Sequence, residues 1–173
     1  MPAVSLGTGG SSETLNVTDY TRLWLEAGGR AIDSAADYHD ATRAQAAIAA
    51  SGVARSELFL TSKCPGGGYN ATYTCGLAQL AAFDTSYLDL LLIHFPDGAH
   101  TNDDWRALEK LHQEEKVRAI GVSNFGRSDL EALLKVATVP IAVNQCEKFV
   151  GQHRSDDAEA FCREKGITFE AYS

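Results

Sequence analysis

The chain has 173 residues, enough for one hydrophobic core, and we expect a single domain over residues 1–173. Its hydrophobic fraction of 45% and charged fraction of 22% are ordinary for a globular protein. A net charge of −8 without a basic patch argues against a nucleic-acid-binding surface, and no apolar run approaches the roughly 20 residues of a membrane span.

The cysteines and the amino terminus are typical of a cytoplasmic protein. Cys64, Cys75, Cys146 and Cys162 show no CxxC spacing, so we expect neither a zinc site nor a redox motif. We expect reduced thiols at all of these positions, as the cytoplasm favours. The histidines have no partners at metal spacing either, so no metal is expected. Residues 1–6 have no basic lead and no long apolar core, which argues against a signal peptide.

In the first half of the chain, short apolar runs alternate with helical patterns. Residues 7–12 are rich in glycine and serine and predict a flexible turn. The apolar spacing from Val17 to Ala27 predicts a helix that stops at Gly28-Gly29, and small residues from 44 to 48 mark a second helix. Strands are predicted over residues 3–6, 31–33 and 58–63.

The second half contains the longest apolar run, Tyr87–His94. Its continuity suits a strand covered on both faces, as in a parallel sheet flanked by helices. The helix expected before it, over residues 73–81, contains Gly76, which weakens the helical pattern. Further strands are predicted over residues 119–124, 141–145 and 167–172.

Three later helices carry signals at their starts. Asn102 is the expected cap of the helix that contains Trp105, and Asp103-Asp104 are read as solvated residues at that helix end. Ser128 and Glu131 match a capping box. The last helix is expected to begin near Ser155 and to have acidic residues in its first turn, which the helix dipole favours.

Alternating strands and helices predict an α/β fold with parallel strands and right-handed crossovers. A doubly wound sheet would carry a Gly-rich phosphate fingerprint after its first strand, but residues 7–10 lack the third glycine at the required spacing. Polar side chains instead follow several strands, as at the active end of a (β/α)8 TIM barrel. We therefore predict an incomplete barrel of about seven strands and six helices, because a full barrel needs roughly 200 residues or more.

Six ordered segments resemble the motifs of the aldo-keto reductases across essentially the whole chain. Any one of them alone would be a weak signal, whereas all six in order make a strong one. The segments are Asp33-Ser34-Ala35-Ala36-Asp37-Tyr38, Thr61-Ser62-Lys63, Leu92-Ile93-His94-Phe95-Pro96, Gly121-Val122-Ser123-Asn124-Phe125, Val143-Asn144-Gln145 and Ala171-Tyr172-Ser173.

The resemblance implies reduction of an aldehyde or ketone to an alcohol. Such a reaction needs a hydride donor at the carbonyl carbon and a proton donor at its oxygen. By resemblance, Tyr38 is the general acid, Lys63 lowers the Tyr38 pKa, and Asp33 holds Lys63 in place. His94 would orient and polarise the carbonyl.

The resemblance also implies a nicotinamide cofactor. Ser123, Asn124 and Gln145 would hold its carboxamide, with Asp33 beside them, and Tyr172 would stack on its ring. NADPH is the expected donor, and NADH stays open as an alternative.

On the substrate side, the resemblance places Gly9, Tyr38, His94 and Phe95 around the carbonyl compound. The first-strand loop carries Gly9 and Gly10 where a bulky pocket residue is common, so an open, weakly selective pocket is expected. Phe95 directly follows His94 and is expected at the pocket mouth.

Each residue also has a plain structural interpretation. Asp33 could cap a turn, His94 could be a hydrogen-bonded structural histidine, and Tyr38 and Lys63 could be a loop anchor and an ion-pair partner. Two alternative functions stay open: a non-catalytic scaffold of the same ancestry, and an aldolase-type barrel in which Lys63 forms a Schiff base. An open barrel would also expose strand edges that favour self-association.

Overall fold

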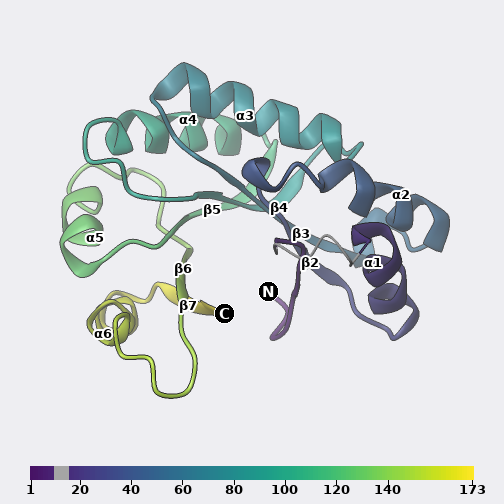
Figure 1. The fold of residues 1–173 in the computed structure, drawn as a ribbon. Coiled ribbons are helices and arrows are strands. Elements are labelled where there is room, and N and C mark those ends of the chain that lie inside the picture. Colours follow the sequence, from purple (N-terminus) through teal and green to yellow (C-terminus); the bar gives the residue numbers. More distant parts are fainter. Residues whose placement is uncertain (10–15) are drawn as a thin grey trace.

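The computed structural model describes residues 1–9 and 16–173, in which seven parallel strands form one sheet in chain order. Figure 1 shows the sheet curled like part of a barrel wall, with the helices on its outer side. β1 pairs with β2 and β7 pairs with β6, so β1 and β7 are the two edges. The predicted incomplete barrel is confirmed. The strands are β1 (Leu6–Gly7), β2 (Ala31–Asp33), β3 (Phe59–Cys64), β4 (Leu88–Ile93), β5 (Val117–Ser123), β6 (Val143–Glu147) and β7 (Thr168–Tyr172).

Six α-helices and two short 3-10 helices connect these strands within the described ranges. None of the helices found there is long and apolar enough to cross a membrane. The α-helices are α1 (Val17–Glu26), α2 (Ala41–Ser51), α3 (Tyr69–Ala82), α4 (Thr101–Gln113), α5 (Arg127–Leu133) and α6 (Asp156–Lys165), and the 3-10 helices are η1 (Ala36–Tyr38) and η2 (Arg55–Glu57).

The side chains of β4 alternate between two apolar layers. Leu91 and Ile93 are completely buried in the main core between the sheet and the outer helices. Leu90 and Leu92 belong to a smaller inner cluster with Val143 of β6. This alternation explains why the strand is apolar at almost every position, since both of its faces are covered.

Two predicted helix caps are wrong. α4 begins at Thr101 with His100 as its N-cap, so Asn102 lies inside the helix. α5 begins at Arg127, and the Asp129 carboxylate accepts a hydrogen bond from the Gly126 N–H at 3.0 Å. The bond that was predicted between Ser128 and Glu131 is therefore made two residues earlier, between Gly126 and Asp129, and Ser128 lies within the first turn of the helix. Ser155 is the N-cap of α6, as predicted.

The interface between α3 and α4 explains two residues that the sequence pattern misrepresents. A Cβ at Gly76 would lie 2.4 Å from Leu111 Cδ1, so a glycine lets the two helices pack closely. Asp104 is fully buried rather than solvated. Its carboxylate accepts hydrogen bonds from the Gly68 N–H at 2.8 Å and the Thr72 hydroxyl at 2.6 Å, which fixes the start of α3.

The expectation of four reduced thiols is wrong for two of them. Cys64, the last residue of β3, forms a disulfide with Cys75 of α3. The glycine-rich loop between them lets α3 return over the end of β3, so that residues 11 positions apart meet. Cys146 and Cys162 are free and buried.

Candidate active site

A buried ion pair joins the carboxyl ends of β2 and β3. The Lys63 ammonium donates to the Asp33 carboxylate and, at 3.1 Å, to the backbone oxygen of Ser34. Lys63 is only 2% exposed and Asp33 8%. A charge buried this deeply needs an opposite charge and further hydrogen bonds, and both residues have them.

Tyr38 lies directly above this pair, at the end of η1. The Lys63 Nζ is 5.2 Å from the centroid of the Tyr38 ring. Gly9 packs closely against the ring, since a Cβ there would lie 2.6 Å from Tyr38 Cε2. Gly9 and Tyr38 are thus neighbours, as expected, while Gly10 falls outside the described residues.

The electrostatic environment of Tyr38 differs from the expected one. Burial raises the pKa of Tyr38 to about 12, with further increases from the carboxylates of Asp33, Asp40 and Asp37. The sequence argument expects Lys63 to lower this pKa. The direction is opposite because burial, followed by the carboxylates of Asp33, Asp40 and Asp37, disfavours the phenolate. Tyr38 therefore keeps its proton at neutral pH.

His94 follows β4 and faces Tyr38. The two rings meet edge to face with centroids 5.7 Å apart. His94 is buried, and its Nδ1 lies 3.2 Å from the Asp37 carboxylate. Burial, and then the positive charge of Lys63, lower the pKa of His94. A neutral ring whose Nδ1 lies beside a carboxylate carries its proton on Nδ1. Phe95 stacks on the His94 ring at 4.5 Å and is 50% exposed.

Gln145, near the end of β6, connects the far side of the sheet to the ion pair. Its Nε2 donates to Asp33 Oδ2 at 2.7 Å and to Glu170 Oε2 at 3.0 Å. Burial raises the pKa of Glu170, a half-buried residue of β7. Glu170 was not among the residues predicted for the site, although its position near the end of a predicted strand could have signalled it.

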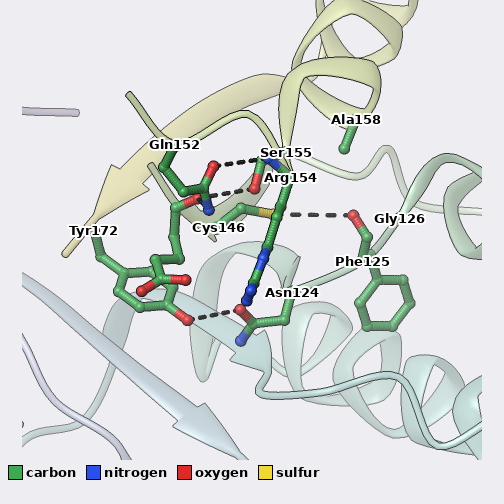
Figure 2. Close-up of a pocket in the computed structure, with 10 residues that line it drawn as sticks. Asn124, Phe125, Gly126, Cys146, Gln152, Arg154, Ser155, Ala158 and Tyr172 are labelled. Carbon is green, nitrogen blue, oxygen red and sulfur yellow. Dashed lines mark hydrogen bonds between the residues drawn. The ribbon is translucent and has the colours of Figure 1, made fainter. Parts of the chain in front are cut away.

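The residues after β5 form a second hydrogen-bonded group. The buried Ser123 hydroxyl donates to the Gln145 backbone oxygen at 2.9 Å. The Asn124 amide donates to the backbone oxygen of His94 at 3.0 Å and to Ser123 Oγ at 3.1 Å. Figure 2 shows the Tyr172 hydroxyl donating to Asn124 Oδ1, a distance of 2.7 Å. One network therefore links the predicted cofactor residues to His94.

A cavity of about 220 Å³ lies beside Asn124 and Tyr172 (Figure 2). Cys146 and Arg154 are among its other lining residues, and the Arg154 side chain extends toward Asn124 in that view. Tyr172 is 40% exposed, so part of it is accessible to a ligand. Asn124 is the member of the hydrogen-bonded group of Ser123, Asn124 and Gln145 that lines this cavity.

The sequence motifs thus converge at one end of the sheet. Asp33, Tyr38, Lys63 and His94 lie together, and Gln145 binds to this cluster directly. The sequence argument missed Asp37 and Asp40: Asp40 is 2% exposed and accepts a bond from the Ser34 hydroxyl at 2.7 Å. Asp37 contacts His94, which is distant in the chain, and Asp40 contacts Ser34 through the shape of one loop. Residue spacing alone indicates neither contact.

Nearly the whole chain matches one protein-family model. Residues 3–173 match the model described as the aldo/keto reductase family. A glyoxal reductase of Bacillus subtilis is 40% identical over 100% of this chain and 63% of its own length. A 9,11-endoperoxide prostaglandin H2 reductase of Trypanosoma cruzi is 37% identical over 100% of this chain and 62% of its own length.

Solved structures show the same likeness. An aldo-keto reductase from a Medee basin deep-sea metagenome library superposes with a TM-score of 0.92 at 36% identity, covering 99% of this chain and 64% of that one. A Bombyx mori aldo-keto reductase in complex with NADP has a TM-score of 0.91 at 30% identity, covering 100% of this chain and 62% of that one. The chain spans less than two thirds of the length of each of these relatives.

Proposed function

Because the chain belongs to the aldo/keto reductase family, we propose that it reduces aldehydes or ketones to alcohols with NADPH as the hydride donor. The observation that carries the proposal is the cluster of Tyr38, His94 and the Lys63–Asp33 pair at one strand end. A family of oxidoreductases and a relative named as a glyoxal reductase support carbonyl reduction. The relative from Bombyx mori that holds NADP supports the cofactor, and NADH is the alternative.

In this proposal Tyr38 supplies the proton. A bound nicotinamide would supply a hydride to the carbonyl carbon, which leaves negative charge on the carbonyl oxygen. An alkoxide is a far stronger base than a phenolate, so Tyr38 can protonate it even with a pKa of about 12. The Lys63 ammonium, 5.2 Å from the ring, stabilises the phenolate that remains until water returns the proton.

Asp33 positions Lys63, and His94 borders the place where the carbonyl group would bind. Asp33 fixes Lys63 beneath the Tyr38 ring, and it is held in turn by Gln145. A neutral His94 that donates from Nδ1 to Asp37 bounds the site, and its Nε2 is then a hydrogen-bond acceptor. Only the protonated ring can donate from both nitrogens and polarise the carbonyl as well.

In this proposal a nicotinamide binds on the side of β5, β6 and β7. Ser123, Asn124 and Gln145 supply hydroxyl and amide groups for its carboxamide, and the partly exposed Tyr172 supplies a flat ring. These groups lie within one hydrogen-bonded network with Asp33, so the cofactor residues and the proton donor share one end of the sheet.

A binding titration followed by a carbonyl screen tests the proposal. NADPH added to the purified protein should quench its tryptophan fluorescence in a saturable way. Aldehydes should then accelerate NADPH oxidation, and Tyr38→Phe should lose about 100-fold or more of that rate while still binding NADPH. A folded protein without NADPH binding or turnover would contradict the proposal and favour the non-catalytic scaffold.

The structure gives no support to the aldolase-type alternative. A Schiff base forms from a neutral amine with a free lone pair. Lys63 instead donates to Asp33 and to the Ser34 backbone oxygen in a buried pair. Borohydride should therefore trap no substrate carbon on Lys63.

A further inference from the structure

Asp37 places a carboxylate at the point where the proposed substrate would bind. It precedes Tyr38 in η1, and its side chain is 50% exposed, whereas Tyr38 is half-buried and His94 is buried. Its Oδ2 lies 3.2 Å from the His94 Nδ1. The carboxylate therefore borders both residues that would receive the carbonyl group and remains open to solvent.

No nearby group cancels the charge of Asp37 in the described part of the chain. His94 has a pKa lowered by burial and by Lys63, so its ring is neutral at pH 7 and contributes a hydrogen bond without a countercharge. Lys63, the cation of this cluster, forms its ion pair with Asp33. Asp40 adds a further buried carboxylate behind Ser34.

The acidic groups act together on the site. The carboxylates of Asp33, Asp40 and Asp37 surround Tyr38 and, after burial, act to raise its pKa. A ligand that brings its own carboxylate to this position would meet like charge, which opposes binding.

We propose that Asp37 makes the site select carbonyl compounds by charge, favouring neutral and cationic aldehydes or ketones over those that carry a carboxylate. The inference rests on the proposed function and names the substrate class of the same site. Phe95, stacked on His94 and half-exposed, adds an apolar wall that suits an uncharged aromatic or aliphatic body. Asp37 acts here as a specificity-determining residue.

Three aldehydes of nearly equal shape test the proposal. Benzaldehyde, 4-carboxybenzaldehyde and (4-formylphenyl)trimethylammonium are compared by kcat/KM with NADPH. The protein should prefer the cation to the anion, and Asp37→Asn, which keeps the shape and a partner for His94, should shrink that ratio roughly five-fold. Added salt should also lower the ratio of kcat/KM for the cation to that for the anion in the original protein, because salt screens exposed charges.

Asp84→Asn is the matched control. Asp84 is exposed at the opposite end of β4 and has a φ of +45°, a conformation that asparagine tolerates. The variant removes the same charge far from the site, so it should leave the cation-to-anion ratio unchanged. A ratio that falls equally in both variants would show a general charge effect and would overturn the role of Asp37.

A binding measurement decides the inference even without turnover. In calorimetric titrations of the original protein, benzyltrimethylammonium should have a lower dissociation constant than benzoate. Asp37→Asn should reduce the ratio between the two dissociation constants. If no carbonyl compound in the screen is reduced, the proposed function fails, and this binding comparison still tests the charge preference. If benzaldehyde is reduced but the preference is equal in the original protein and the Asp37 variant, the inference alone is wrong.

Discussion

Gln145 donates a hydrogen bond from Nε2 to Asp33 Oδ2 at 2.7 Å, although the two residues are 112 positions apart in the chain. The other oxygen of the same carboxylate pairs with Lys63. Asp33 is therefore shared by the proposed cofactor side and the proposed proton-transfer side of the site. We therefore expect a substitution of Gln145 or of Lys63 to alter the position of Asp33, and through Asp33 the position of the other residue.

Gln145→Leu should destabilise the fold by about 1–3 kcal/mol, because it leaves one oxygen of the buried Asp33 without its donor. Urea unfolding measures this change. The exposed Gln113 offers a matched control, and Gln113→Leu should stay within about 0.5 kcal/mol of the original protein. Equal stability of both variants would mean that the Gln145 bond contributes nothing to Asp33.

Lys63→Met should destabilise the protein by about 3–5 kcal/mol, because Asp33 then keeps a buried charge without a partner. Adding Asp33→Asn to that variant should recover part of the loss, since the amide carries no charge and still offers Gln145 an acceptor. A double-mutant cycle by urea unfolding measures the coupling. Additive effects of the two substitutions would show that the pair is not coupled.

The sequence predicted the parts of the site that strand ends determine. Asp33 ends β2, His94 directly follows β4, and Lys63 and Gln145 lie within two residues of the carboxyl ends of β3 and β6, so strand prediction brings them to the same end of the sheet. The order of strands likewise follows from the alternating pattern, because consecutive parallel strands joined by helices become neighbours.

The remaining features depend on partners that no local pattern specifies. Asp37 meets His94 across 57 residues, and the buried Asp104 reaches Thr72 across 32. The disulfide of Cys64 and Cys75 depends on how α3 returns over β3, which their spacing does not show. The direction of the Tyr38 pKa was missed for the same reason: it depends on burial and on which carboxylate already holds Lys63.

His94 should make the protein less stable in mild acid. Its folded-state pKa is lowered by burial, so the unfolded chain binds the proton more readily. The stability that neutral His94 contributes is present above the unfolded pKa of about 6.5 and is lost as pH falls through the lower folded value. The urea midpoint should therefore drop more between pH 7.5 and pH 5.5 in the original protein than in His94→Asn. An equal drop in both would assign the acid sensitivity to other groups.

Cys75→Ser should cost about 2–3 kcal/mol of stability, the amount expected for opening a closed loop of this length. Dithiothreitol should lower the unfolding temperature of the original protein and leave that of the variant unchanged. If the denatured original protein shows four free thiols instead of two, and no response to dithiothreitol, Cys64 and Cys75 are not bonded in solution.

The free edge of β7 should promote self-association. In the described chain this strand pairs with β6 on one side, and its outer side presents backbone donors and acceptors that another strand can bind. Light scattering after size exclusion should show a mass above that of one chain, falling on dilution.

Thr168→Lys places a charge on an exposed position of this edge and should shift the protein toward monomer, because like charges oppose edge pairing. Ser128→Lys adds the same charge on exposed α5 and should leave the mass unchanged. A monomer at all concentrations, with cooperative unfolding, would show that the edge does not mediate association.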